Sequence, residues 1–373
     1  MLELDIPTAA DESAHHRPIA AGPRFQTMNT YRVVELLGDG ISPELSRSVH
    51  AIAASLPCRI EFIPVDLSEP NRTRRGEALY DEIVELMKRH RIALKYPTAT
   101  TAESPNQVLR ERCAFAVIHR PVCTIPGIST NFTKKLDIDV IRIATGGTYD
   151  DPGRRIGTDC AVSLRVIERR PSMWAARYAF QLARAHKTLA HPMTVTSASK
   201  YTIQRATDGL FEEAVDDVAR DFTDIPHRRE LFDALLANLI LHPERYSVIV
   251  CPNEYGDFLS DAACGLIGSI GLGDSTSLAF GEDGQVKIAM FDPAGGTAPD
   301  IAGKDLCNPT AALLSLANLL RHVGELELSR HLRAQLLSAI ADGRSTGDIG
   351  GKLSTSEFTA EVARRVQVEL ARV

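Results

Sequence analysis

The feature that most constrains the fold is an alternation of short apolar segments with amphipathic segments along the chain. Apolar runs that predict buried strands span residues 32–37, 115–118, 138–143, 193–197, 246–251 and 286–291. Helical spacing of apolar residues occurs at 171–186, at 208–221, from 257 to 265, and twice between 308 and 342. This alternation predicts an α/β architecture in which helices cover a sheet.

A glycine turn follows the first predicted strand. Gly38-Asp39-Gly40 interrupts the apolar run. Ser42-Pro43-Glu44 then provides a capping residue, a first-turn proline and an acid near the positive end of a helix. The turn lacks the G-x-G-x-x-G spacing of a dinucleotide-binding Rossmann fold, so we expect a non-Rossmann fold.

Length and composition narrow the class of protein. The chain has 373 residues, 44% of them hydrophobic and 24% charged, which is typical of a globular protein with two domains or two lobes. A net charge of −6 argues against a nucleic-acid partner, and the absence of a long apolar run argues against a membrane partner. The seven cysteines include no CxxC pair, which predicts reduced thiols and a cytoplasmic location. Residues 1–29 show no periodicity, and we expect a disordered tail there.

Two acids follow the strand predicted at 246–251. Asp257 and Asp261 are four residues apart at a predicted helix start, so their carboxylates share one helix face. Such a pair suits a hard divalent cation, Mg²⁺ or Mn²⁺, whose shell is completed by water and substrate. Two solvated acids in the first turn of a helix would give the same spacing.

Three arginines lie in or beside apolar segments. Arg142 is inside the predicted strand Val140-Ile141-Arg142-Ile143, and a buried arginine needs a partner. If Arg110 and Arg120 converge with it, the three would bind a di- or tricarboxylic acid. Three structural salt bridges are the alternative.

Lys200, after a predicted strand, and Tyr149, in a glycine-bearing loop, are candidates for a base and an acid, or else ordinary surface residues.

These segments together resemble the isocitrate and isopropylmalate dehydrogenase family of β-decarboxylating dehydrogenases, and NAD-dependent isocitrate dehydrogenases in particular. The resemblance runs from about Arg32 to the C-terminus. The segments that carry it are GDGISPE (38–44), NEYGDFLSD (253–261), GTAPDIAGK (296–304) with Asn308-Pro309, and TGDIGG (346–351).

The resemblance implies an isopropylmalate-dehydrogenase-like two-domain fold with its active site in the interdomain cleft. Residues 30–115 and 268–373 would form a large domain with the cofactor site. Residues 116–267 would form a small domain that carries the dimerisation and metal-ligand elements. Two chains would form a homodimer with shared active sites, so Lys200 and Asp233 of one chain would act in the site of the other.

The resemblance also implies roles for individual residues. Tyr149 and Lys200 would be catalytic. Asp300 would bind the adenosine ribose hydroxyls of NAD and repel a 2′-phosphate. The expected substrate-binding residues are Ser104, Asn106, Arg110, Arg120 and Arg142; the expected metal ligands are Asp233, Asp257 and Asp261; and the expected NAD-binding residues are Gly295, Gly296, Thr297, Ala298, Pro299, Asp300, Ile301, Asn308 and Asp348.

Some positions depart from the family pattern. Gly146 replaces an acid, Gly295 replaces a histidine, and Lys200 is followed by Tyr201 rather than a small residue. We therefore expect metal-dependent oxidative decarboxylation of a 3-substituted malate with NAD⁺. The substrate would be a small hydroxy acid: isocitrate or a polar analogue, such as a carboxylated or phosphonylated malate in a specialised biosynthetic pathway.

Three alternatives remain open at this point. The chain would be an ordinary NAD-dependent isocitrate dehydrogenase with a divergent sequence, or a non-catalytic regulatory subunit of a hetero-oligomeric isocitrate dehydrogenase. A metal-dependent hydrolase would explain the aspartate pair but not the GTAPDIAGK segment.

Overall fold

The computed structural model describes residues 29–101, 103–186, 193–268 and 272–371. The tail expected over residues 1–29 therefore lies outside the described residues, except for Asn29. The side-chain amide of Asn29 donates a hydrogen bond to the Glu325 carboxylate at 2.8 Å. This residue is thus tied to the folded part of the chain.

Strands and helices alternate, as the apolar pattern predicts. The strands are β1 (Thr30–Leu37), β2 (Arg59–Asp66), β3 (Ile92–Lys95), β4 (Phe115–Cys123), β5 (Asp137–Ile143), β6 (Arg154–Ile156), β7 (Cys160–Val162), β8 (Val195–Ser199), β9 (His227–Leu231), β10 (Val248–Cys251), β11 (Asp274–Phe280) and β12 (Val286–Pro293). The helices are α1 (Ser42–Ala53), α2 (Glu69–Arg75), α3 (Glu77–His90), α4 (Pro105–Arg112), α5 (Arg169–His186), α6 (Thr207–Ala219), α7 (Phe232–Leu241), α8 (Asn253–Ile267), α9 (Thr310–His322), α10 (Leu326–Ala341) and α11 (Thr355–Leu370).

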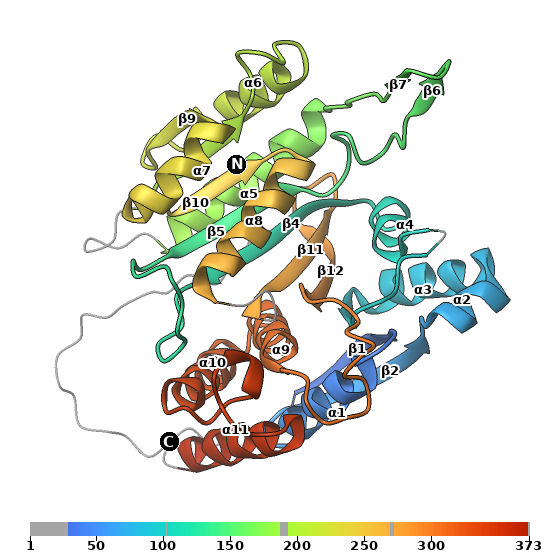
Figure 1. Cartoon of the computed structure of the whole chain (residues 1–373), viewed down its shortest axis with the longest axis vertical. Coiled ribbons are helices and arrows are strands. Elements are labelled where there is room, and N and C mark those ends of the chain that lie inside the picture. Colours follow the sequence, from blue (N-terminus) through green and yellow to red (C-terminus); the bar gives the residue numbers. More distant parts are fainter. Residues whose placement is uncertain (1–28, 102, 187–192, 269–271, 372–373) are drawn as a thin grey trace.

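A mixed sheet forms the centre of the fold (Figure 1). Within the described residues it has ten strands, in the order β2-β1-β3-β12-β11-β4-β5-β10-β8-β9. The strands pair in parallel toward both ends of the sheet, whereas β12, β11, β4 and β5 pair antiparallel in the middle. Strands β6 and β7 form a separate hairpin that projects from the body of the molecule.

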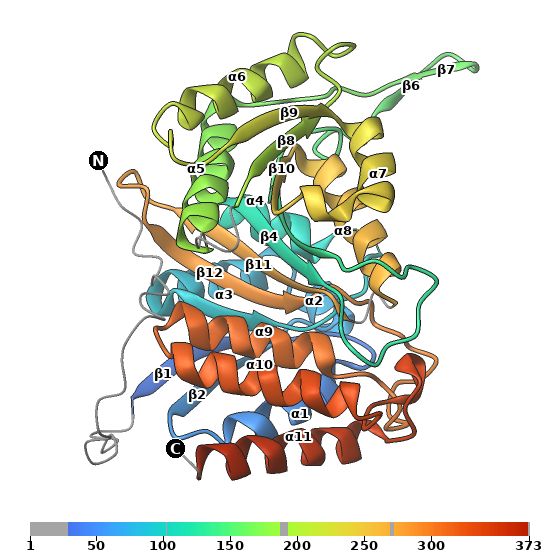
Figure 2. The same ribbon diagram turned by 90° about the vertical axis from the view of Figure 1, so that its left-hand side faces the viewer.

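Helices cover both faces of the sheet. Helix α5 packs on one face of β4, β5 and β10, and α8 packs on the other (Figure 1). At the other end, α9 covers β11 and β12 and is backed by α10, α1 and α11 (Figure 2). The result is a layered α/β fold with buried apolar side chains on both faces of the sheet. Among the described residues, no helix has both the length and the apolar character to cross a lipid bilayer.

The sheet joins the two segments that we predict to be separate domains. Strands β1, β2, β3, β11 and β12 come from residues 30–115 and 268–373 and form one half of the sheet. Strands β4, β5, β8, β9 and β10 come almost entirely from residues 116–267 and form the other. The halves meet where β11 pairs with β4, with Thr276 opposite His119. The domain boundaries themselves stay a prediction.

Two local predictions about helix starts are wrong. Ser42 is the first residue of α1 rather than its cap, and its hydroxyl accepts a hydrogen bond from the Gly38 backbone N–H at 2.7 Å. It therefore stabilises the glycine turn. The helix predicted to begin at Asp257 begins at Asn253, because Asn253 and Glu254 are buried and form its first turn directly after Pro252.

Candidate active site

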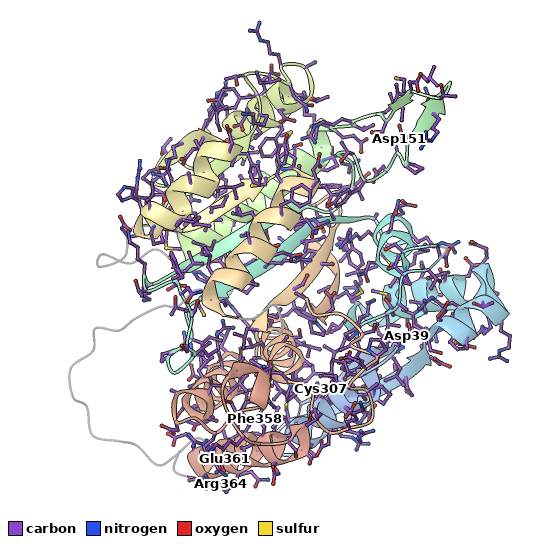
Figure 3. All side chains as sticks on the ribbon, in the orientation of Figure 1. Asp39, Asp151, Cys307, Phe358, Glu361 and Arg364 are labelled. Carbon is purple, nitrogen blue, oxygen red and sulfur yellow. The ribbon has the colours of Figure 1, made fainter. Side chains whose placement is uncertain are left out.

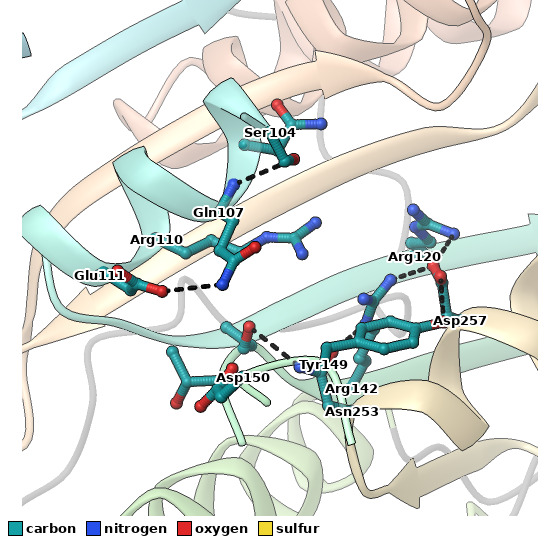
Figure 4. A pocket seen from close by; sticks show the side chains of 13 residues that line it. Ser104, Gln107, Arg110, Glu111, Arg120, Arg142, Tyr149, Asp150, Asn253 and Asp257 are labelled. Carbon is teal, nitrogen blue, oxygen red and sulfur yellow. Dashed lines mark hydrogen bonds and ion pairs between the residues drawn. The ribbon is translucent and has the colours of Figure 1, made fainter. Parts of the chain in front are cut away.

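One cavity of about 320 Å³ lies beside the junction between the two halves of the sheet (Figure 4). Its walls come from α4, β4, the end of β5 with the segment that follows it, and the start of α8. All five residues that we predict to bind substrate line it, together with Tyr149 and Asp257. The lining residues are Ser104, Asn106, Gln107, Arg110, Glu111, Arg120, Arg142, Ala144, Thr145, Tyr149, Asp150, Asn253 and Asp257.

Arg142 joins strand β5 to helix α8. Only 1% of its side chain is exposed. Its guanidinium pairs with Asp257 and donates from Nε to Asn253 Oδ1 at 2.8 Å. Gly256 permits this approach, because a Cβ there would lie 2.6 Å from Arg142 Cβ. The partner that a buried arginine requires is thus supplied by the residues after β10.

Arg120 bridges the two acids of α8. Its Nη1 lies 3.3 Å from Asp257 Oδ1 and 2.8 Å from Asp261 Oδ1, and it also donates to Ser260 Oγ at 2.7 Å. Arg120 and Arg142 therefore form salt bridges, which was one of the two interpretations of the sequence. The other interpretation was that the arginines converge on a substrate site, and these salt bridges do lie at a cavity.

Arg110 differs from the other two arginines. In the described part of the chain its guanidinium has no hydrogen bond or ion pair, and it points into the cavity (Figure 4). Burial lowers the pKa of Arg110, and burial together with the Arg110 charge lowers the pKa of Arg142 to about 9. A guanidinium that lowers the pKa of its neighbour in this way indicates a positive potential, which an anionic ligand relieves.

Tyr149 faces the same acid as the arginines. Its hydroxyl donates to Asp257 Oδ2 at 3.0 Å, while the arginines contact Oδ1. Burial, followed by the negative charge of Asp257, raises the pKa of Tyr149. The hydroxyl therefore carries the proton that it donates to Asp257.

Asp257 and Asp261 fit a hard divalent cation. They lie one turn apart on α8, and a single nitrogen of Arg120 contacts both carboxylates, so their oxygens converge on one small volume. A Mg²⁺ or Mn²⁺ ion would take the place of that nitrogen. Within the described residues, no group of three or more His, Cys, Asp or Glu side chains is arranged to hold a metal in one chain. Further ligands would have to come from water, substrate or a second chain.

The predicted base and the third predicted metal ligand lie together, outside the cavity lining. Lys200 Nζ donates to Asp233 Oδ1 at 2.8 Å, and this hydrogen bond lowers the pKa of Asp233. Asp233 is in the first turn of α7, with 68% of its side chain exposed. A single chain thus carries a cavity with Tyr149 and Asp257, and separately an exposed lysine–aspartate pair.

A buried ion cluster, Arg165–Asp208–Glu254, connects these two groups of residues. The Arg165 guanidinium pairs with Glu254 at the start of α8 and contacts Asp208 of α6 at 2.8 Å. Asp208 also accepts a hydrogen bond from the Lys200 backbone N–H at 2.7 Å. The cluster therefore fixes the turn that carries Lys200 relative to the helix that carries Asp257. No local pattern singled out Arg165, because its partners are distant in sequence.

The segment that we predict to bind NAD follows β12 and packs on the glycine turn. Gly40 has a φ of +59°, and a Cβ there would lie 1.9 Å from the Thr297 carbonyl oxygen. The Glu44 carboxylate accepts hydrogen bonds from the backbone N–H groups of Gly303 and Asp305, each at 2.8 Å. Residues 38–44 thus support the predicted cofactor loop. Asp39, labelled in Figure 3, likewise accepts backbone hydrogen bonds within the fold.

The predicted cofactor residues form an accessible surface. A Cβ on Gly295 or Gly296 would meet no atom within 4 Å, so a ligand can approach the backbone there. Asp300 is exposed. Asn308 Nδ2 donates to Asp348 Oδ2 at 3.0 Å, which joins the two cofactor segments. That these residues bind NAD stays a prediction. The remaining predicted contacts, Thr297, Ala298, Pro299 and Ile301, are in the same loop.

The α4 wall of the cavity contains residues that the sequence predicts to bind substrate and others that it did not indicate. Ser104 caps α4 and accepts from the Gln107 backbone N–H at 3.4 Å. The side-chain oxygen of Asn106 is buried without a hydrogen-bond partner in the described residues. Gln107 and Glu111 were missed, although positions three and seven residues after Ser104 share its helix face. The other lining residues that were missed are Ala144, Thr145, Asp150 and Asn253.

A buried lysine near the cavity was also missed. Lys95, at the end of β3, is 2% exposed, and its ammonium donates to the Tyr96 carbonyl at 3.0 Å. Burial lowers its pKa to about 8, although the charge of Asp292 acts in the opposite direction. No spacing in the sequence marked this lysine.

Comparison with known proteins agrees with the geometry. The isocitrate/isopropylmalate dehydrogenase family profile matches residues 32–362. The human mitochondrial isocitrate dehydrogenase [NAD] subunit alpha is 34% identical over 359 residues, covering 95% of this chain and 95% of the human one. Subunit 2 of the Saccharomyces cerevisiae mitochondrial enzyme is 35% identical, covering 90% of each chain.

A solved structure extends the similarity to the fold. Isocitrate dehydrogenase from Methylococcus capsulatus superimposes with a TM-score of 0.80 at 29% identity, covering 90% of this chain and 99% of that one. The sequence matches span nearly the whole chain and include the cavity, the acids of α8 and the loop after β12. The chain therefore belongs to the isocitrate/isopropylmalate dehydrogenase family.

Proposed function

We propose that this chain catalyses the metal-dependent oxidative decarboxylation of a 3-substituted malate, isocitrate or a polar isocitrate analogue, with NAD⁺ as hydride acceptor. The relatives described above are NAD-dependent isocitrate dehydrogenase subunits. The observation that carries the proposal is the convergence of Tyr149, Asp257 and three arginines in one cavity.

The arginines supply the recognition of a hydroxy acid with two carboxylates. Asp257 and Asp261 would hold the dication, and Arg120 and Arg142 would then be released from these acids. The freed guanidinium groups would then pair with substrate carboxylates in a two-pronged geometry. Arg110 is already without a partner. Together they would fix which carbon–carbon bond breaks.

A metal ion and NAD⁺, when bound, would supply the remaining chemistry. Bound Mg²⁺ or Mn²⁺, used in this family, would contribute the positive charge that makes the C2 hydroxyl more acidic, and bound NAD⁺ would accept the hydride. Tyr149 holds a proton at its hydroxyl, and we propose that it gives this proton to C3 after CO₂ has left. Lys200 of a second chain would receive the proton of the C2 hydroxyl.

A homodimer is part of the proposal, and two features support it. Lys200 and Asp233 lie outside the cavity of their own chain. Large apolar side chains are also more than half exposed: Ile240 and Leu241 on α7, Phe258 on α8, and Ile156 on the projecting hairpin. Uncovered apolar groups on this scale favour an interface, and a two-fold symmetric one would bring each lysine to the other cavity.

The test uses the purified chain alone. NADH formation and CO₂ release are measured with Mn²⁺ and malate, isocitrate, isopropylmalate, homoisocitrate, tartrate or phosphonomethylmalate. We expect one 3-substituted malate to give equal amounts of NADH and CO₂, with activity lost in EDTA and restored by Mn²⁺. Absence of turnover with every acid contradicts the proposal.

A second candidate is a regulatory subunit of a hetero-oligomeric enzyme. The names of the relatives describe subunits, and one chain does not gather Lys200 with Tyr149. This function predicts that the chain is inactive alone but changes the activity of a separate catalytic chain. Co-purification of tagged protein from its native cell, followed by assay of any associated chain, distinguishes the two.

We also propose a cytoplasmic location. All seven cysteines are free and most are buried, which suits a reducing compartment. The relatives described above are mitochondrial, so cell fractionation with markers for both compartments is the test. Recovery with the mitochondrial marker contradicts this proposal.

A further inference from the structure

The α4 end of the cavity carries polar groups that the proposed function leaves unused. Gln107 Nε2 donates to Glu111 Oε1 at 3.0 Å, so the two side chains lie together on the helix face that begins at Ser104. Asp150 lines the cavity from the loop after β5, and its carboxylate accepts a hydrogen bond from the Gly146 backbone N–H at 2.7 Å. Two carboxylates therefore border this end.

Charge is divided along the length of the cavity. Arg120 and Arg142 gather around Asp257 at one end, whereas Glu111 and Asp150 lie toward the other (Figure 4). In the described part of the chain, neither Glu111 nor Asp150 forms an ion pair. The end proposed to bind the malate carboxylates thus holds the guanidinium groups of Arg120 and Arg142, and the end left for the C3 substituent holds two exposed acids without an ion pair in the described residues.

The groups at the acidic end are mostly hydrogen-bond acceptors. As carboxylates, Glu111 and Asp150 can only accept hydrogen bonds. Gln107 has already used one N–H on Glu111, and the buried oxygen of Asn106 has no donor. An amide such as Asn106 can rotate to present either its oxygen or its nitrogen, so the two carboxylates are what distinguish one substituent from another.

We propose that the C3 substituent of the substrate ends in a hydrogen-bond donor without negative charge, such as an amide, hydroxyl or ammonium group, and that Glu111 selects it. This inference rests on the proposed function and narrows its substrate class. A donor group forms charge-assisted hydrogen bonds with Glu111 and Asp150. A third carboxylate or a phosphonate meets like charges there, at a cost that water and salt reduce but do not remove.

The test compares two substituents of equal size. Isocitrate carries a carboxymethyl group at C3, and its amide analogue carries a carbamoylmethyl group with the same stereochemistry. The kcat/KM of each is measured with NAD⁺ and Mn²⁺. We expect the amide to be preferred by about tenfold. Glu111→Gln should shift the ratio roughly fivefold to tenfold toward isocitrate, as removal of one nearby partly screened charge implies.

Two further variants sharpen the test. Asp150→Asn should shift the ratio in the same direction as Glu111→Gln. Glu85→Gln, an exposed change on α3 outside the cavity, should leave the ratio unchanged. A preference of the unaltered chain for isocitrate, or a ratio unaffected by Glu111→Gln, overturns the inference while leaving the proposed function intact. Failure of the unaltered chain with both acids, and with every other malate, contradicts the proposed function instead.

Discussion

Lys200 Nζ lies 2.8 Å from Asp233 Oδ1, and neither residue lines the cavity that holds Tyr149 and Asp257. A lysine that acts within its own chain would be expected to face that cavity. The Arg165–Asp208–Glu254 cluster fixes the Lys200 turn to the helix of Asp257, so the separation is built into the packing. This arrangement is the one that shared active sites require.

Hybrid dimers should reveal the shared site. Lys200→Ala should reduce kcat by a factor of about 10² or more, as loss of a proton-transfer group does, and Asp257→Asn should also be inactive. When the two variants are co-expressed with different tags, a hybrid dimer regains one intact site. The unsorted mixture should therefore recover about a quarter of the wild-type activity if chains pair at random. A hybrid as inactive as either parent would show that Lys200 acts within its own chain.

The two acids of α8 should differ in their effect on stability. Both Asp257→Asn and Asp261→Asn should weaken Mn²⁺ binding, measured by electron paramagnetic resonance. Asp257→Asn also leaves the buried Arg142 short of a partner and should lower the free energy of unfolding by roughly 2–3 kcal/mol. Asp261 is 54% exposed, so its replacement should cost under about 1 kcal/mol. Equal losses in urea denaturation would contradict this account.

Cofactor preference should depend on Asp300. Asp300→Lys removes a carboxylate that would repel a 2′-phosphate and adds a charge that attracts one. The ratio of kcat/KM for NAD⁺ over NADP⁺ should fall by about tenfold or more. Glu282→Lys makes the same change of charge on the exposed β11–β12 turn and serves as the control. An equal effect of both variants would mean that overall charge, not Asp300, sets the preference.

The Arg165–Asp208–Glu254 cluster should contribute to stability. Arg165→Met leaves two buried carboxylates without their cation and should destabilise the fold by about 3–5 kcal/mol. Arg169→Met removes two ion pairs that are largely exposed, on α5, and should cost at most about 1 kcal/mol. Thermal unfolding of the two variants provides the comparison. A small effect at Arg165 would mean that the cluster does not fix the Lys200 turn.

A carboxylate on α11 that is hydrogen-bonded by two arginines gives a prediction for stability in acid. Hydrogen bonds from Arg364 and Arg365 lower the pKa of Glu361 to about 2 (Figure 3). A lowered carboxyl pKa stabilises the fold above the pKa of the unfolded chain, and this contribution disappears as pH falls from about 4.5 toward 2. Glu361→Gln should therefore cost about 1 kcal/mol at pH 7 and progressively less in acid. Glu327→Gln, at an exposed pair, is the control. A cost that does not vary with pH contradicts this account.

The sequence indicates Arg142 and Asp257 as site residues, and the structure brings them together in one cavity. Arg142 lies in a run of buried residues and therefore needs a partner, and Asp257 follows another buried strand that pairs with β5. Carboxyl ends of neighbouring parallel strands meet at one edge of a sheet. The pattern alone leaves open whether these residues converge, and the resemblance to the dehydrogenase family is what predicts that they share one site.

The cavity residues that the sequence did not predict come from segments that are distant in sequence and pack together only in the fold. Glu111 and Asp150 meet at one cavity because α4 packs beside the segment after β5, and no local spacing records that approach. Strand β9 was missed for a different reason. It forms an edge of the sheet, and its sequence, His-Arg-Arg-Glu-Leu, lacks the apolar run by which buried strands are recognised.

The backbone pairing of β11 with β4 has a mechanical consequence. Backbone hydrogen bonds cross the junction from Thr276 opposite His119 to Ala279 opposite Phe115. The two sides of the cavity therefore belong to one continuous sheet and are not joined by a flexible linker alone. Closure of the cavity around a ligand would therefore have to change the twist of one continuous sheet. The free energy for that change in twist would have to come from binding of the ligand.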